Sequence, residues 1–457
     1  MLRLSGGQVE SLWDEVLPGE VRELPADLAA LDVLLRDRRL LTPIASGWQR
    51  QAVTHGRPTL SMATYVRLMV VKLRTGWGYE TLVREVSDSI HLRRFCLIAL
   101  GERVPDESTV RKLTRRLGAA VVNEITRVVI DEARREKRFR PRAARIDATV
   151  VEGDLRYPTD SGLALDSARV LAREASKLLR KVGRDAGHVR DRSRAIGRRV
   201  RAMTRTLGRR TGERKQQVLK LTAQAGKLVE SSIGEAKRLV TVARRRARGR
   251  GAQAKLRQIQ RLQQFIDRAE RVGEQIRLRV RGEPINDRLV SIFDPDARPI
   301  RKGKLGKPNE FGFVTQICEV TEHTKRGARG LIIPTTSQVG NPQEDVLLPE
   351  TVTELERLGL RPREVALDGG FRPGPTRTSL QPLGPKRTFI AGRQQPGSRR
   401  TQRRLARYRT GTEGRISHLK RGYGLRRSRL KGEHGMKAWT GWAILTYNLD
   451  TLAIRAS

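Results

Sequence analysis

Apolar residues recur three and four positions apart through the first third of the chain, which is the spacing of one face of an α-helix. Two such stripes fall within the first 55 residues, one formed by Val9, Leu12, Trp13 and Val16 and the other by Leu28, Leu31, Leu34 and Leu35. A further apolar segment at 61–74 is interrupted by Gly76-Trp77-Gly78, and the pattern resumes at 79–86. We therefore predict that residues 1–140 form an all-helical domain.

A short basic helix follows within this domain. Asp106 or Ser108 is its predicted N-cap, and the helix should run through 111–117 and stop at Gly118. A basic helix after a capped turn is typical of a helix-turn-helix segment that lies in the DNA major groove. The candidate DNA-contacting residues are Arg111, Lys112 and Arg115. The alternative interpretation is the solvated face of an ordinary helical bundle.

From Leu165 to about Arg281 the chain is rich in arginine and in helix-forming residues, and its apolar residues are sparse but periodic. One stripe consists of Val218, Leu221, Ala225 and Leu228, and a second of Ile259, Leu262, Ile266 and Ala269. The spacing predicts long helices packed as a coiled-coil-like hairpin, with a break at 244–251. We interpret residues 165–282 as a basic helical insertion whose charged face contacts DNA backbone, a solvated face being the alternative.

Strand-like patterns flank this insertion. Strands are predicted at 145–152, 311–320, 330–334, 365–368 and 387–391, and helices at 343–358 and around Glu413. A terminal helix with an apolar stripe should cover the sheet; the stripe comprises Trp439, Trp442, Leu445, Leu449 and Leu452. This order is that of an RNase H-like fold. We predict an α/β protein in which 141–164 and 283–457 form an RNase H-like mixed sheet with flanking helices, preceded by the all-α DNA-binding domain and interrupted by the insertion.

Three carboxylates occupy positions at which such a fold could hold metal. Asp147 lies in the first strand, Asp368 ends a later strand, and Glu413 lies on a predicted helix. Mg²⁺ prefers hard oxygen ligands, and two such ions about 3.5–4 Å apart activate a nucleophile and neutralise a scissile phosphate. Arg409 and Lys420 share the helical face of Glu413 and could hold the flanking DNA phosphates.

Four other polar residues receive weaker assignments. Asp160 is expected to cap the following helix rather than bind metal, and strand alternation turns Glu152 away from the face of Asp147. His418 should be a phosphate contact or a packing residue. Lys304 precedes a strand and is a candidate DNA contact, a solvated loop being the alternative.

Charge strengthens the case for a nucleic-acid partner. The 457 residues include 93 Lys and Arg against 49 Asp and Glu, a net charge of +44, and such a field favours polyanions through counterion release. Cys96 and Cys318 are expected to be buried free thiols. No apolar run approaches the ~20 residues that span a bilayer, and no signal-peptide pattern appears. We expect no membrane association and a cytoplasmic, nucleoid-associated protein in a bacterial cell.

Taken together, these segments resemble the DDE transposases of bacterial insertion sequences, in the lineage with a helical N-terminal domain and an RNase H-like core. The resemblance runs from about Arg57 to Leu452. It is carried by the segments 146–152 (IDATVVE) with 157–161 (YPTDS), 302–304 (KGK), 307–312 (KPNEFG), 340–345 (GNPQED), 367–371 (LDGGF) and 413–421 (EGRISHLKR). Two positions depart from the family pattern: Ala406 stands where a tyrosine is usual, with Tyr408 nearby, and Gly369 follows the second acid.

The resemblance implies the catalytic and metal-binding residues. The triad would be Asp147, Asp368 and Glu413, and the R-x3-E-x6-K signature would fall on Arg409, Glu413 and Lys420. It also implies two Mg²⁺ ions, for which Mn²⁺ could substitute, binding to the terminal inverted repeats of the element, and strand transfer into target DNA by the freed 3′-hydroxyl. Pairing two ends of double-stranded DNA leads us to expect a homodimer.

Two other classes of function remain open. One is a catalytically inactive or domesticated DNA-binding protein that acts as a repressor. The other is an RNase H-like nuclease that cuts branched or hybrid substrates without strand transfer. Inverted repeats and a short target duplication flanking the gene would favour transposition over both.

Overall fold

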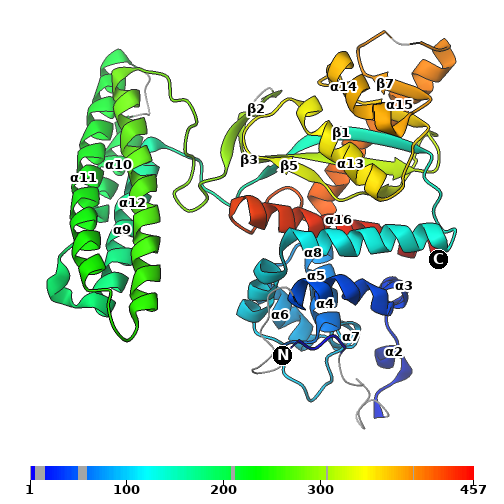
Figure 1. Cartoon of the computed structure of the whole chain (residues 1–457), viewed down its shortest axis with the longest axis horizontal. Helices are drawn as coiled ribbons and strands as arrows, with labels where there is room; N and C mark the ends of the chain where they lie inside the picture. Colours follow the sequence, from blue (N-terminus) through cyan, green and yellow to red (C-terminus); the bar gives the residue numbers. More distant parts are fainter. Residues whose placement is uncertain are drawn as a thin grey trace. The chain divides into compact units, whose positions relative to one another are not determined.

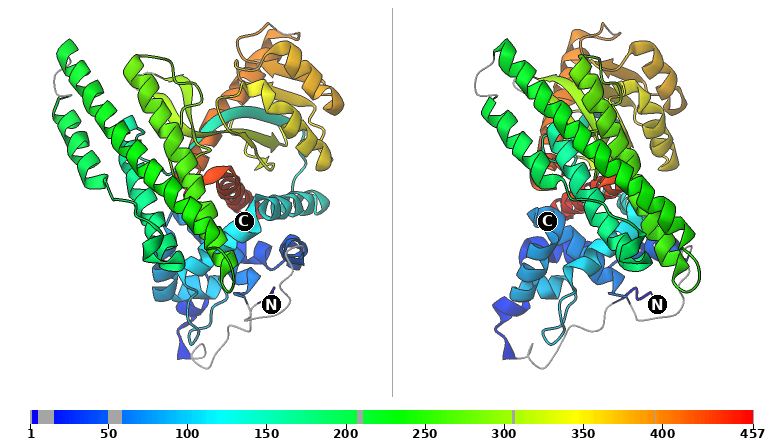
Figure 2. Two further views of the ribbon diagram at one scale, coloured as in Figure 1. Left: turned by 60° about the vertical axis from the view of Figure 1, so that its left-hand side comes forward. Right: turned by 90° about the vertical axis from the view of Figure 1, so that its left-hand side faces the viewer.

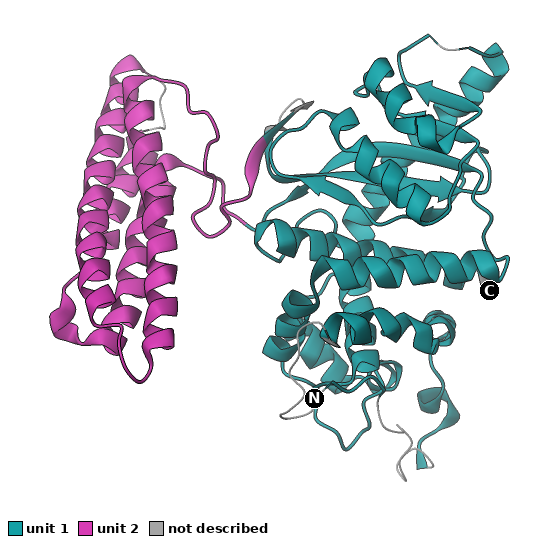
Figure 3. Ribbon diagram, viewed as in Figure 1, with its two compact units in different colours: residues 1–154, 300–457 teal, residues 155–299 magenta. Residues whose placement is uncertain are grey.

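The protein is a mixed α/β chain that divides into two compact units, residues 1–154 with 300–457 (unit 1) and residues 155–299 (unit 2) (Figure 3). The computed structural model describes residues 2–5, 16–49, 59–206, 211–304, 307–394 and 396–456. The first predicted apolar stripe, Val9 to Val16, lies outside this range except for Val16, which is exposed. Within the described residues, no helix combines the length and apolar composition needed to cross a bilayer.

Helices make up the N-terminal part of unit 1. They are α2 (Gly19–Arg22), α3 (Ala26–Leu35), η1 (Arg38–Leu41), α4 (Thr42–Gln49), α5 (Met62–Thr75), α6 (Tyr79–Asp88), α7 (Ile90–Phe95) and α8 (Glu107–Arg135). Leu28 and Leu31 of the second predicted stripe are buried. The Ser61 hydroxyl caps the first turn of α5, and Gly76 ends it in the left-handed conformation that glycine adopts without steric cost.

Helix α8 extends beyond the predicted stop at Gly118. Asp106 is its N-cap, as one of the two predicted alternatives, and its carboxylate accepts a 2.8 Å hydrogen bond from the Ser108 amide. Gly118 has φ 67° and ψ −169°, so the helix breaks there, but it resumes at once and continues to Arg135. The first segment of α8 therefore ends at Gly118, as predicted, and a second segment follows directly, in which Val122 and Ile125 are buried.

Unit 1 also contains a mixed sheet with the strand order β2-β3-β1-β6-β7, to which β4 and β5 add by pairing with β3. The bounds are β1 Ala143–Glu152, β2 Arg298–Lys304, β3 Lys307–Thr321, β4 Leu331–Ile332, β5 Thr336–Gln338, β6 Glu364–Leu367 and β7 Arg387–Ile390. Strand β1 is antiparallel to β3 and parallel to β6, and β6 is parallel to β7. Every predicted strand has a counterpart, whereas β2 and β5 were not predicted.

Helices cover this sheet (Figure 1). They are η3 (Glu344–Val346), α13 (Leu348–Arg357), α14 (Pro373–Leu380), η4 (Gln381–Leu383), α15 (Arg399–Gly422) and α16 (Gly432–Ala456). All five residues of the predicted terminal stripe are buried on α16. This helix contacts α8, α5 and α3 as well as β4, and the Asn448 amide bonds both the N–H and the C=O of Ile332 at 2.8 Å. The terminal helix is therefore shared between the sheet and the N-terminal helices.

Unit 2 is a helical bundle whose long helices run side by side in both views of Figure 2. The helices are α9 (Asp160–Val182), η2 (Arg184–Ala186), α10 (Ser193–Thr206), α11 (Gly212–Arg245) and α12 (Ala252–Arg281). All four residues of the second predicted stripe and Ala225 of the first are buried in its core. The N-cap of α9 is Thr159 and not Asp160, whose carboxylate instead pairs with Arg279 at 3.0 Å and Arg288 at 2.9 Å.

Candidate metal centre

Three carboxylates of unit 1 converge where β6 ends beside the middle of the central strand β1. Strands β1 and β6 are parallel neighbours in which Ile146 pairs with Leu367, so the next residues, Asp147 and Asp368, emerge side by side. Oxygen atoms of Asp147, Glu344 and Asp368 all lie within 4.8 Å of one another. Asp147 is buried, with its Oδ1 2.7 Å from the Ala148 amide, and the other two are partly exposed. The donors are all carboxylate oxygens, which suit a hard divalent cation such as Mg²⁺.

Glu344 is the member of this cluster that the sequence did not single out. It begins η3, and its backbone carbonyl accepts a 2.8 Å hydrogen bond from the Gln316 side chain on β3. The neighbouring Asp345 is buried and pairs with Arg372 at 2.7 Å, which fixes the turn against the start of α14. Residues 340–345 contribute to the resemblance to DDE transposases, but the resemblance assigns no catalytic or metal-binding role to Glu344.

Gly370 leaves room for Glu344. A Cβ at Gly370 would lie 2.6 Å from Oε2 of Glu344, closer than real Cβ contacts. The absence of a side chain at Gly370 therefore allows the Glu344 carboxylate to approach the end of β6. Gly369, which departs from the family pattern, packs its backbone near the carbonyl of Ala391.

Glu413 lies beside the cluster and is linked to it by an arginine. Arg409 Nη1 donates to Asp368 Oδ1 at 2.7 Å, and its Nη2 lies 3.0 Å from Glu413 Oε1. The side chain of Glu413 is 60% exposed, whereas that of Arg409 is 16% exposed. One guanidinium therefore neutralises part of the charge of two acids on different elements. Lys420, which follows Glu413 on the same helix, is half-buried.

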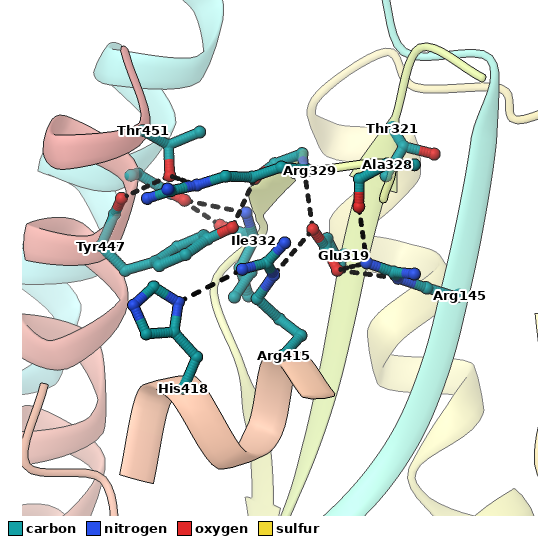
Figure 4. A network of polar contacts seen from close by, with 12 residues as sticks. Arg145, Glu319, Thr321, Ala328, Arg329, Ile332, Arg415, His418, Tyr447 and Thr451 are labelled. Carbon is teal, nitrogen blue, oxygen red and sulfur yellow. Dashed lines mark hydrogen bonds and ion pairs between the residues drawn. The ribbon is translucent and has the colours of Figure 1, made fainter. Parts of the chain in front are cut away.

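A buried ionic network holds α15 against the sheet (Figure 4). Glu319 on β3 is fully buried, and its carboxylate accepts hydrogen bonds from Arg145 Nε at 2.8 Å, Arg415 Nε at 3.0 Å and the Gly330 amide at 2.8 Å. A Cβ at Gly411 would collide with the Arg145 guanidinium, so α15 can approach β1 closely only with glycine there. Because Arg415 and Glu413 share one helix, this network also fixes where Arg409 and Glu413 point.

Two other residues of α15 belong to its packing. Tyr408 is buried and its hydroxyl lies 2.7 Å from that of Thr321. His418 Nδ1 is 3.2 Å from Arg415 Nη1, and its ring packs edge-on against Tyr423 and Tyr447. Burial, followed by the charge of Arg415, lowers the pKa of His418. Of the two roles expected for His418, a phosphate contact or a packing residue, these contacts favour packing.

The remaining predicted contact residues lie elsewhere. On α8, Arg111 pairs with Glu107 at 3.1 Å, and Lys112 and Arg115 are exposed. The side chain of Lys304 lies outside the described residues. Glu152 pairs with Arg427 at 3.2 Å. Both cysteines are free and buried, as predicted.

Comparison with known families matches residues 21–116 to a family described as Transposase domain (DUF772). The matched segment runs through the N-terminal helices into the first part of α8. It does not include Asp147, Glu344 or Asp368 of the candidate metal centre. It supports a transposase family for this chain. Searches of curated proteins and of solved structures gave no match.

Proposed function

We propose that this protein is a DDE-type transposase that binds the terminal inverted repeats of an insertion sequence and catalyses metal-dependent cleavage and strand transfer of DNA. The family match over residues 21–116 supports the transposase class. The convergence of Asp147, Glu344 and Asp368 within 4.8 Å carries the catalytic part of the proposal.

The sheet supports an RNase H-like core. Its central strand β1 has an antiparallel neighbour, β3, on one side and the parallel strands β6 and β7 on the other. The first acid lies on the central strand and the second directly follows its parallel neighbour. A helix that follows the last strand, α15, carries Glu413. The three acids follow one another on these elements in the order expected from the sequence, and β2, β5 and α14 are additional elements.

Asp147, Asp368 and Glu413 are the proposed catalytic residues and metal ligands, with Glu344 as an additional ligand. Two Mg²⁺ ions, or Mn²⁺ in their place, would activate the attacking oxygen and neutralise charge at the scissile phosphate. Asp147, on the central strand, is the only one of the four that is buried. Arg409 holds Asp368 and Glu413 towards each other through its two hydrogen-bonding nitrogens.

Basic residues would hold the DNA on either side of this centre. Arg409 and Lys420 on α15 and the Lys304 segment are proposed to contact phosphates near the cleaved bond. The exposed Lys112 and Arg115 on α8, with Arg111, are proposed to contact the element ends. Two ends must be paired for transposition, so we propose a homodimer acting on double-stranded DNA in the bacterial nucleoid.

Replacement of the first acid tests this function. Asp147→Asn keeps the side-chain shape but removes the charge, and should abolish cleavage of a duplex carrying an element end while leaving its dissociation constant within about twofold of the wild type. Asp88→Asn, on an exposed helix end of α6, is the matched control and should cleave normally. Strand transfer retained by Asp147→Asn would refute the assignment. Wild-type cleavage without strand transfer would indicate a nuclease, and binding without cleavage a repressor.

A further inference from the structure

Unit 2 carries half of the net charge of the protein. Residues 155–299 include 37 Lys and Arg against 15 Asp and Glu, a net charge of +22 out of +44 for the whole chain. This charge is not distributed evenly. No acid occurs between Glu235 and Asp267, a stretch that contains the end of α11 and the beginning of α12.

The bundle has two chemically different ends. The chain enters it at the start of α9 and leaves it at the end of α12, and the pairs from Asp160 to Arg279 and Arg288 mark this entry end. At the opposite end, α9 stops, η2 follows, and α11 turns into α12. Arg246 closes this far end by donating to the carbonyl of Val182 at 3.2 Å and pairing with Asp185 at 2.7 Å.

We call the far end the distal tip and define it by six arginines that are exposed there: Arg180, Arg184, Arg244, Arg245, Arg248 and Arg250. Within the described part of the chain, none of the six forms an ion pair, and the nearby acid, Asp185, already pairs with Arg246.

Elsewhere on the same bundle, some basic side chains are matched with acids, while others, such as Arg198, Arg201 and Arg238, are exposed. Arg277 pairs with Glu230 and Glu274, and Arg271 pairs with Asp287 at 2.8 Å. Ion pairs between exposed groups add little stability, but they reduce the local field available to a polyanion. What distinguishes the distal tip is that its six exposed arginines lie close to a single acid, which is already paired, at the end of a stretch that contains no other acid between Glu235 and Asp267.

We propose that the distal tip is a second DNA-binding surface, which contacts the phosphates of duplex DNA without reading its sequence. The inference rests on the proposed function, because that function supplies duplex DNA as the partner. Arginine binds phosphate oxygens through two parallel N–H groups. A surface that inserts into a membrane would need several exposed large apolar residues. Near the tip, among the described residues, Leu256 is such a residue, with 45% of its surface exposed. Phosphates of a nucleic acid therefore fit this surface better than a membrane does.

The length of the bundle separates this contact from the entry end. At 1.5 Å per residue, α9 is ~35 Å long and α12 ~45 Å long. A duplex turn is about 34–36 Å. The distal tip therefore lies about one duplex turn along the bundle from the chain connections.

The test measures how salt weakens DNA binding by the full-length protein. The tip variant R244Q/R245Q/R248Q/R250Q is compared with the control K237Q/R271Q/R277Q/R281Q, whose four residues lie on the same bundle but take part in ion pairs. Both variants lose four positive charges. Fluorescence anisotropy with a long duplex of unrelated sequence gives the slope of log affinity against log salt concentration.

Each lost phosphate contact should reduce the magnitude of this slope by about 0.9, so the tip variant should lose roughly 2 to 4 units and the control less than about 1. Loss of affinity should be uniform across sequences, and circular dichroism should show unchanged helix content. A wild-type slope in the tip variant, or an equal reduction in the control, would overturn the proposal. Cleavage of element ends by the wild type reports the proposed function separately, because the slope is measured on DNA that is not cleaved.

Discussion

Glu319→Gln is the most direct test of how the fold positions α15. The substitution keeps the shape of the side chain but removes the negative charge that two buried guanidinium groups share. The side chains of Arg145 and Arg415 are 3% and 12% exposed, and that of Glu319 is 0% exposed. Breaking a buried ion pair from one side costs about 3–5 kcal/mol because the remaining charge is left without compensation. With two arginines affected, we expect the upper part of this range.

Tryptophan fluorescence during urea denaturation measures this loss in the right part of the molecule. All five tryptophans lie outside residues 155–299, so their signal reports on unit 1. Glu85→Gln is the control: it removes one partner of an exposed pair with Arg84, and should leave the denaturation midpoint near that of the wild type. A loss below about 1 kcal/mol for Glu319→Gln would show that the buried carboxylate does not hold α15 in place.

Two further substitutions probe the site and the packing around α5. Gly370→Ala should displace the Glu344 carboxylate and raise the Mg²⁺ concentration needed for cleavage about 10-fold, as measured by metal titration, whereas Gly374→Ala, where an added Cβ meets nothing within 4 Å, should change nothing. Burial, and then the charge of Arg429, lowers the pKa of Lys72 from 10.5 to about 8. The unfolded chain therefore binds this proton more tightly than the folded chain does. The free energy of unfolding should rise between about pH 8 and 10.5, by at most about 3 kcal/mol. Lys72→Met should flatten that rise in urea titrations across this pH range, and an unchanged pH dependence would contradict the buried charge.

Local patterns predicted much of the fold and part of the site. Asp147 and Asp368 were identifiable because the first lies in an apolar strand and the second directly follows one, and parallel neighbours in one sheet place such residues together. The apolar stripe of α16 was identifiable for the same kind of reason. The elements that pack against α16 could not be identified in this way. An apolar stripe shows that a helix face is buried, but it does not show that both a sheet and a layer of helices cover that face.

The features that were missed depend on contacts distant in sequence. Strand β2 is a polar segment with Ile300 as its buried apolar residue, and it is defined by pairing with β3 rather than by alternation. Glu344 lies in a short 3-10 turn within the longer helix that was predicted there, and its approach to the strand ends depends on the missing Cβ of Gly370. Thr159 replaced Asp160 as the cap because Asp160 is drawn into ion pairs with arginines more than 100 residues away.

The position of α16 has a consequence for how the protein matures on the ribosome. The N-terminal helices are translated first, but α5 and α8 cannot complete their apolar contacts until residues 432–456 have emerged. Their unfinished surfaces would meanwhile be open to chaperones. The same late helix also seats β4 through Asn448. A nascent chain should therefore complete its helical layer and its sheet together, once residues 432–456 have left the ribosome.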